Sequence, residues 1–228
     1  MTIARFKDLC VDVSSPSEMA AFWGQVIGLT APADNPNVLV GDVPEKTIWM
    51  CTVPEAKTVK NRVHLDVLTG AIEDLEQYGA TVETPATEEL PWTVMLDPER
   101  GEFCGFVRET VPAYRLMELV VDSAEPEAQA RWWAGVVGGD LGSRPGTPWY
   151  WVENVPGLPF PYWVFVPVPE PKTVKNRVHW DVTAPALQPV LDAGATLLRP
   201  KDEEIGWHVC ADPEGNEFCV FVPPAEES

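Results

Sequence analysis

The sequence predicts four modules, each built from one helix and several β-strands, arranged as two tandem copies of one unit. The first observation is an internal repeat: VPEAKTVKNRVHLDV at 53–67 returns as VPEPKTVKNRVHWDV at 168–182. The word DPERGEFCGFV from Asp97 returns at the same offset as DPEGNEFCVFV from Asp212. A fainter repeat pairs RFKDLCVDV at 5–13 with RLMELVVDS at 115–123. Because repeated sequence marks a repeated structural unit, the chain divides into residues 1–110 and 111–228.

The first module of each copy begins with a strand and a helix. Alternation in KDLCVDV predicts the strand, and Pro16 after Ser15 predicts a helix start whose capping box pairs Ser15 with Glu18. In the second copy Asp122 or Ser123 is the expected cap. Helical spacing predicts a buried stripe formed by Met19, Phe22, Trp23 and Val26 in the first copy and by Ala130, Trp133 and Val137 in the second.

Short apolar runs complete the first modules, and the second modules follow. Strands are expected at 37–40, 47–53, 148–152 and 162–168. The VHLDV and VHWDV ends of the repeated words alternate as strands. Helices are then expected at 71–78 and 185–193, closed by Gly79 and Gly194, and final strands at 92–96, 102–107, 207–211 and 217–222. Each half is therefore a pair of βαβββ modules.

Composition excludes several classes of partner. The formal charge of −19 argues against nucleic acid and anionic membranes, which bind proteins through Lys and Arg. No stretch reaches membrane-spanning length and the N-terminal segment lacks an apolar signal region, so a cytoplasmic protein is expected. Five cysteines, an odd number, suit free thiols in a reducing compartment. Ten tryptophans point to an aromatic-lined cavity.

The words VPExKxVKNRVHxD and DPEGNEFC, with the order of elements, resemble the vicinal oxygen chelate superfamily, in particular its glyoxalase-like branch, which is also grouped with bleomycin-resistance proteins. The resemblance covers nearly the whole chain as two tandem domains. It implies an α+β fold in which paired βαβββ modules form curled mixed sheets that enclose cup-shaped cavities. The family includes metal-dependent lyases, isomerases and dioxygenases as well as metal-free proteins that sequester drugs, so the fold alone leaves the chemistry open.

Metal-using members of the family place four ligands in one cup. The resemblance maps the first onto Asp8 and Glu118, the second near Cys51 and Val166, the third onto His64 and His179, and the fourth onto Cys104 and Cys219. The usual pattern of two histidines and a carboxylate is therefore broken in both copies. Asp8, Cys51, His64 and Cys104 would still suit zinc, whereas the second copy retains only Glu118, His179 and Cys219. We expect no cofactor, with a divalent metal (zinc, iron or manganese) as the alternative.

Alternation places His64 with Asp66, and His179 with Asp181, on one face of their strands, and the opposite apolar face should pack on the helices. A carboxylate beside an imidazole raises the imidazole pKa, which suits a general base. Glu217, two residues before Cys219, is expected to face the same interior. These five residues are the candidate catalytic groups, and the alternative is a structural pair in each copy.

The basic segment KTVKNRVH allows two interpretations. Its lysines and arginine could clamp an anion at a pocket rim. Alternatively, it forms a turn whose arginine pairs with the carboxylates of the DPE word, and its presence in both copies favours this scaffolding role.

Two functions remain open from sequence. The first is a binding module that holds a flat, largely apolar molecule between aromatic rings, for which the candidates are Trp49, Trp92, Trp149, Trp151, Trp163 and Trp207. The second is a metal-dependent lyase, isomerase or dioxygenase that uses His64 or His179. The Pro- and Trp-rich insertion at 142–161 makes the halves unequal, so we expect one ligand per chain. Sequence leaves undecided whether modules pair within or between halves, and whether the protein is a pseudo-dimeric monomer or a homodimer.

Overall fold

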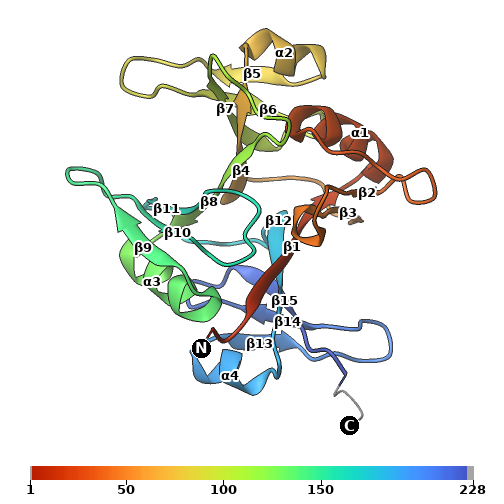
Figure 1. Ribbon diagram of the computed structural model, residues 1–228, viewed down its shortest axis with the longest axis vertical. Coiled ribbons are helices and arrows are strands. Elements are labelled where there is room, and N and C mark those ends of the chain that lie inside the picture. The colour runs from red at the N-terminus through yellow and green to blue at the C-terminus, as the bar shows by residue number, and fades with distance from the viewer. Residues whose placement is uncertain (1, 225–228) are drawn as a thin grey trace.

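A computed structural model describes residues 2–224 and consists of two mixed β-sheets with four α-helices (Figure 1). The seven-stranded sheet has the order β13-β14-β15-β12-β1-β3-β2. Its strands are β1 (Arg5–Val13), β2 (Val38–Leu39), β3 (Ile48–Thr52), β12 (Val178–Thr183), β13 (Thr196–Arg199), β14 (His208–Ala211) and β15 (Glu217–Phe221).

The eight-stranded sheet has the order β5-β6-β7-β4-β8-β11-β10-β9. Its strands are β4 (Val63–Thr69), β5 (Thr81–Thr84), β6 (Thr93–Leu96), β7 (Glu102–Val107), β8 (Leu116–Ser123), β9 (Asp140–Ser143), β10 (Tyr150–Glu153) and β11 (Tyr162–Pro167). The helices are α1 (Pro16–Ile27), α2 (Ile72–Gln77), α3 (Pro126–Val137) and α4 (Gln188–Asp192), with a 3₁₀ turn, η1, at Pro44–Lys46. The α+β fold expected from sequence is confirmed.

Each sheet combines one module from each half of the chain. β1 pairs antiparallel with β12, which joins the first module to the fourth, and β4 pairs antiparallel with β8, which joins the second module to the third. The sequence left this pairing open. Its consequence is that neither copy of the repeat builds a sheet alone, and each sheet offers one composite site.

Helices α1 and α3 fill the space between the two sheets. Trp133 of α3 packs within 4.6 Å of Trp163 on β11, and within about 5 Å of Trp180 and Phe218 in the other sheet, as measured between ring centroids. Trp23 of α1 likewise lies 5.1 Å from Phe103 on β7. The helical stripes expected from sequence are buried in this shared core. The sheet faces turned away from the helices are therefore the ones free to hold a ligand.

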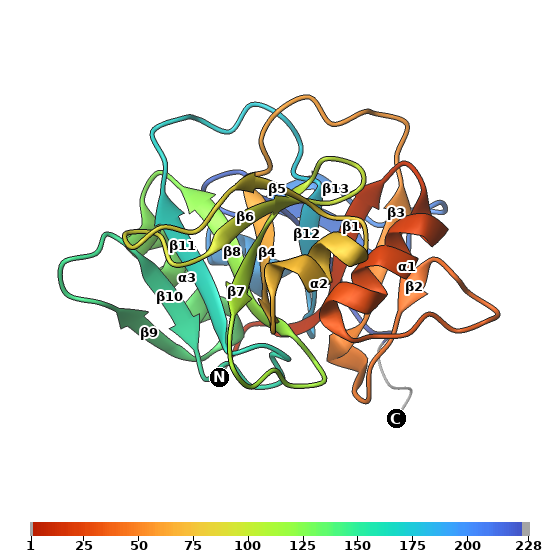
Figure 2. The same ribbon diagram turned by 90° about the horizontal axis from the view of Figure 1, so that it is seen from above.

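The repeated words form two loops that cross between the sheets side by side, which we call the arches (residues 53–62 and 168–177; Figure 2). Arg62 Nη1 donates to the carbonyl of Glu170 in the other arch at 2.6 Å, and Arg177 Nη1 donates to the carbonyl of Glu55 at 2.8 Å. Each arginine thus holds the opposite copy. These contacts support the scaffolding interpretation of KTVKNR.

The helix caps differ from the expected ones. The side chain of Ser15 makes no capping hydrogen bond to α1. Helix α3 begins after Glu125 rather than after Asp122 or Ser123. Instead Glu99, from the DPE word, accepts hydrogen bonds from the amides of Ser14 and Ser15 at 2.7–2.8 Å. Glu214 caps the start of α3 in the same way. A carboxylate supplied by the other sheet satisfies these amides, so the local box is not formed.

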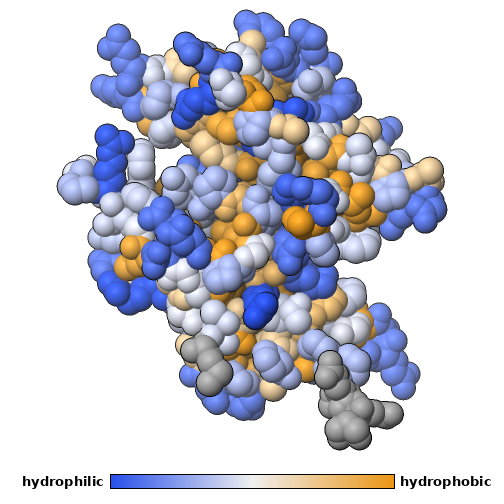
Figure 3. Space-filling model, viewed as in Figure 1, coloured by the Kyte–Doolittle hydropathy of each residue, from blue (hydrophilic) through white to orange (hydrophobic). Residues whose placement is uncertain are grey.

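Three edge strands, β5, β9 and β13, were not anticipated because segments of four residues are too short to show a clear alternating pattern. Among residues 2–224, no helix is long and apolar enough to cross a membrane. Hydrophilic side chains cover the protruding parts of the face seen in Figure 3, and hydrophobic ones surface mainly across its middle.

Candidate functional site

The first candidate site is a cavity of about 560 Å³ on the outer face of the eight-stranded sheet, which we call the eight-strand cup. Alternation positions its floor: His64 and Asp66 on β4, Cys104 on β7 and Glu118 on β8. The alternate residues Leu65 and Val67 point into the core, as expected from sequence. The walls and mouth add Trp92, Val94, Phe106, Val120, Arg144, Trp149, Trp151, Glu153, Tyr162, Val164 and Val166.

Three of the six tryptophans expected to contact a ligand line this cavity: Trp92, Trp149 and Trp151. Trp92 stacks on Phe106, with ring centroids 5.6 Å apart, and meets Trp149 edge to face at 6.0 Å. Trp149 comes from the third module and Trp92 from the second, so the two modules meet at an aromatic corner. The insertion of the second copy therefore supplies part of the wall.

Trp163 does not line the cavity. Its neighbours Val164 and Val166 on β11 face the cup, and strand alternation consequently turns Trp163 into the core, where it is fully buried. Trp49 and Trp207 belong to the other sheet. Trp49 donates to Asp8 Oδ2 at 3.1 Å, and Trp207 stacks on Phe221 at 5.4 Å, repeating the Trp92–Phe106 pair.

The floor of the eight-strand cup holds two carboxyl groups whose pKa values are raised by burial. Asp66 and Glu118 are cross-strand partners. Burial, together with the neighbouring Glu118, raises the pKa of Asp66 well above its usual range, and burial raises the pKa of Glu118 to about 7. Burial also raises the pKa of the Cys104 thiol. Asp66 Oδ1 makes no hydrogen bond within the described residues.

His64 is neutral rather than charged. Its Nε2 lies 3.5 Å from Asp66 Oδ1, too long for a strong hydrogen bond. Burial lowers the pKa of His64 to about 3, helped by the charge of Lys60. The expectation that Asp66 raises the imidazole pKa is therefore wrong, because desolvation outweighs a carboxyl group that is itself protonated. His64 Nδ1 is buried and has no partner in residues 2–224.

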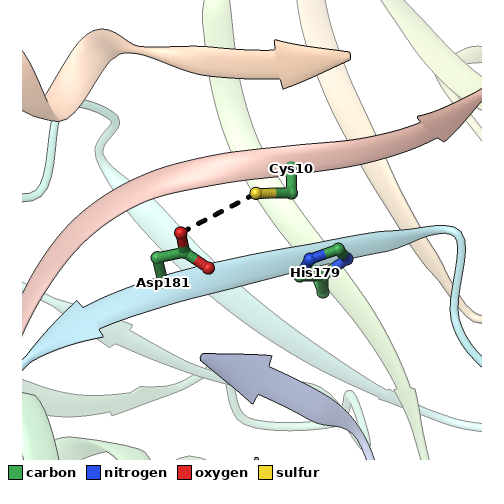
Figure 4. A group of neighbouring side chains, drawn as sticks. All are labelled: Cys10, His179 and Asp181. Atoms are coloured by element: carbon green, nitrogen blue, oxygen red, sulfur yellow. Dashed lines mark hydrogen bonds between the residues drawn. The ribbon is translucent and has the colours of Figure 1, made fainter. Parts of the chain in front are cut away.

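The second candidate site, the seven-strand cup, is the corresponding face of the other sheet. Here Asp8 and Cys10 on β1 lie opposite His179 and Asp181 on β12. The Cys10 thiol points toward Asp181, 3.8 Å away, with the His179 ring beside them (Figure 4). Burial and Asp8 raise the pKa of Asp181 to about 8, and burial lowers that of His179 to about 4.

The metal set proposed from the first copy is split by the module pairing. Asp8 and Cys51 lie in the seven-stranded sheet with His179 and Cys219, while His64 and Cys104 lie in the eight-stranded sheet with Glu118. The donor atoms that come together form two other groups, Cys10–His179–Asp181 and His64–Asp66–Cys104, each within 4.8 Å. Both groups offer sulfur, nitrogen and oxygen, which fits a zinc-like ion. Cys10 was missed, although it lies two residues from Asp8 on the same strand face.

The carboxylate of Glu217, a candidate catalytic base, is instead engaged by residues of an arch. It accepts from Lys172 Nζ at 2.6 Å and from the amide of Asn176 at 3.1 Å. Glu102 makes the same contacts with Lys57 and Asn61 in the other copy. Both carboxylates thus fasten an arch to a strand.

Comparison with known proteins agrees with this architecture. A family described as a glyoxalase-like domain matches residues 8–106 and again 118–221, and the chain belongs to this family. No curated protein matches the chain. Glyoxalase I from Zea mays superposes with a TM-score of 0.64 at 11% identity, covering 96% of this chain and 92% of that one. A Bacillus subtilis protein named as a candidate dioxygenase gives 0.62 at 15% identity, covering 98% and 86%. At these identities the likeness shows the fold.

Proposed function

We propose that the protein binds a small, largely apolar or aromatic molecule in the eight-strand cup. The observation that carries the proposal is the cavity of about 560 Å³ walled by the indole rings of Trp92, Trp149 and Trp151. A volume of this size suits a drug-sized ligand, and aromatic walls with a few polar groups are typical of such sites. The seven-strand cup lacks the wall that the insertion supplies, so one ligand per chain is expected.

The test is a calorimetric titration of the protein with a planar aromatic alcohol, 2-naphthylmethanol. Trp149→Ala should weaken binding at least about fivefold, because stacking of an aromatic ligand on one aromatic side chain contributes roughly 1–3 kcal/mol. Trp207→Ala, the control in the other cup, should leave binding unchanged. No binding by the wild-type protein to a panel of planar aromatics, or equal losses in both variants, would contradict the proposal.

The second candidate function is a lyase, isomerase or dioxygenase that uses a divalent metal through His64 or His179. The two groups of donor atoms within 4.8 Å favour it, as do the Nδ1 atoms of both histidines, which have no hydrogen-bond partner in the described part of the chain. A metal bound there would act as a Lewis acid on an oxygen of the substrate. His64, Asp66 and Cys104 would hold it in one cup, and Cys10, His179 and Asp181 in the other.

Metal analysis of protein purified without chelator separates the two candidates. Stoichiometric zinc, iron or manganese that is lost in His64→Ala or His179→Ala, with the fold retained, would favour the enzyme. Metal-free protein that binds planar aromatics would leave the binding function.

A further inference from the structure

The two cups differ in how their paired carboxyl groups are compensated, and the inference drawn from this rests on the proposed ligand site. In the seven-strand cup, Lys7 Nζ lies 2.5 Å from Asp8 Oδ2 and 4.2 Å from the centre of the Phe221 ring. Trp49 Nε1 donates to the same carboxyl oxygen. The ammonium group is therefore held between a carboxylate and an aromatic face.

The same backbone geometry exists in the eight-strand cup without the cation. The pairing of β1 with β12 shifts register between Phe6 and Asp8, so Lys7 lies in a bulge. The pairing of β4 with β8 shifts at the corresponding place, between Leu116 and Glu118, where the bulged residue is Met117. The repeat that aligns 5–13 with 115–123 thus replaces Lys7 by Met117.

The other two partners of the compensated site also have counterparts. Phe106 corresponds to Phe221 and lines the cavity, so the aromatic face is retained. Val164 corresponds to Trp49, so the indole donor is lost. Glu118, in the place of Asp8, consequently has a ring beside it but neither the ammonium nor the N–H that its equivalent receives.

Charges elsewhere in the cavity are already matched. Lys57 Nζ pairs with Glu102 at 2.8 Å and Lys60 Nζ pairs with Asp122 at 2.6 Å. At the mouth, Arg144 and Glu153 contribute one charge of each sign. The floor pair, Asp66 and Glu118, forms no ion pair with a lysine or arginine among residues 2–224, and Asp66, which is 5% exposed, has an oxygen without a hydrogen-bond partner there.

One cation lies nearby, on the outside. Arg108 is exposed, and its guanidinium carbon is 5.6 Å from the centre of the Phe106 ring. Its Nη1 donates to the carbonyl of Val107, and it forms no ion pair among residues 2–224. The charge of Arg108 lowers the pKa of Glu118, but its guanidinium forms no ion pair with that carboxyl group and so does not take the place that Lys7 holds beside Asp8.

We infer that the ligand of the eight-strand cup carries an ammonium group on its aromatic skeleton, and that this group takes the place that Lys7 occupies in the other cup. It lies between the Asp66–Glu118 pair and the Phe106 ring. Charge-assisted hydrogen bonds to a buried carboxylate are stronger than neutral ones, and a cation over an aromatic face adds further attraction. The class of ligand is thus a flat aromatic amine.

The experiment compares two probes of equal shape, 2-naphthylmethylamine and 2-naphthylmethanol, by calorimetry at neutral pH on chelator-treated protein. The amine should bind at least about tenfold more tightly than the alcohol. Met117→Lys restores the cation of the other cup and should abolish this preference. Glu118→Gln should abolish it as well. Gln77→Lys, an exposed position on α2 outside the cavity, adds the same charge and should leave the preference intact.

The outcomes separate the inference from the proposed function. Equal affinity for both probes, or a preference that survives in Met117→Lys and Glu118→Gln, overturns the inference and leaves the binding site standing. Binding of neither probe removes both. Loss of the preference in Gln77→Lys as well would show a general effect of protein charge, which also overturns the inference. A divalent metal that displaces the amine competitively in the wild-type protein, but not in Glu118→Gln, would support the cation site.

Discussion

Gly142 on β9 is the position where the chain makes room for a wall of the cavity. A Cβ at this residue would lie 2.1 Å from Trp151 Nε1, closer than any real contact, because Trp151 is its cross-strand partner. The absence of a side chain at 142 therefore sets the position of the indole.

Gly142→Ala should displace Trp151, weaken binding of 2-naphthylmethanol and lower the free energy of unfolding by about 1–3 kcal/mol, as overpacking does. Gly135→Ala is the control, since a Cβ there meets nothing within 4 Å. In a helix interior this change should stabilise by about 0.5–1 kcal/mol. Urea unfolding and calorimetry measure both effects, and similar behaviour of the two variants would contradict the argument.

The buried titratable groups predict how stability depends on pH. Asp181 and Glu118 have pKa values raised to about 8 and about 7, so the folded chain keeps protons that the unfolded chain releases. The resulting stabilisation is complete at low pH and is lost as pH rises through those values. The lowered pKa values of His64 and His179 act in the opposite direction, but only below the ordinary histidine value of 6.5.

The free energy of unfolding of chelator-treated protein should therefore fall between pH 6.5 and 8, the window in which the carboxyl groups act alone. Asp181→Asn should flatten this fall, and Asp34→Asn, at an exposed position, should not. Urea unfolding across the window provides the measurement. A stability that rises or stays constant in the wild-type protein would show that the carboxyl groups are ionised in the folded chain.

Sequence predicted which residues share a strand face but not their environment. The alternation of His64 with Leu65 and of Asp66 with Val67 correctly assigned the cup and core faces. The pKa of His64 could not be predicted, because it depends on burial by the folded chain and on the nearby charge of Lys60. Trp163 was misassigned because residue type was weighed above strand parity.

At the scale of elements, the glutamate of each DPE sequence, Glu99 or Glu214, caps a helix that belongs to a different module. Glu99 accepts the amides of Ser14 and Ser15, and its side chain also lies 3.8 Å from Arg177. Local sequence instead indicated Glu18, which is exposed. The capping box of Ser15 and Glu18 is replaced by the contact with Glu99, which is distant in sequence and therefore not detectable from the local pattern.

Glu99→Ala should cost about 1–2 kcal/mol of unfolding free energy, the usual effect of removing a helix cap. Glu18→Ala removes only an exposed charge near the helix start and should cost at most about 0.5–1 kcal/mol. Thermal or urea unfolding of the two variants distinguishes them. A larger loss in Glu18→Ala would restore the capping box inferred from sequence.

At the scale of the whole molecule, the two copies depend on each other. The central strand pairs β1–β12 and β4–β8 both join one half to the other. The sequence predicted the modules and their order. It could not predict which modules pair, because a strand shows the same alternation of apolar and polar residues whichever module supplies its neighbour. Only the arches hint at it, through arginines that reach the opposite copy.

Residues 1–110 and 111–228, produced separately, should each lack cooperative unfolding, because every sheet would lose its central partner strand. Co-expressed, the two pieces should associate one to one and regain the near-ultraviolet signal of the buried tryptophans. Circular dichroism and size-exclusion chromatography measure these properties. A half that unfolds cooperatively as a monomer would contradict the composite architecture.

The register at β12 also determines how the molecule responds to mechanical tension. Arg5 at the start of β1 and Phe221 at the end of β15 both pair with Thr183, on opposite sides of the same strand (β12). A force applied at these two positions would open both ladders from one end, rung by rung, rather than shear them along their length. The seven-stranded sheet should therefore unzip at low force, as pulling on single molecules would measure. The eight-stranded sheet and its cavity lie outside the loaded path and should open in a separate, later event.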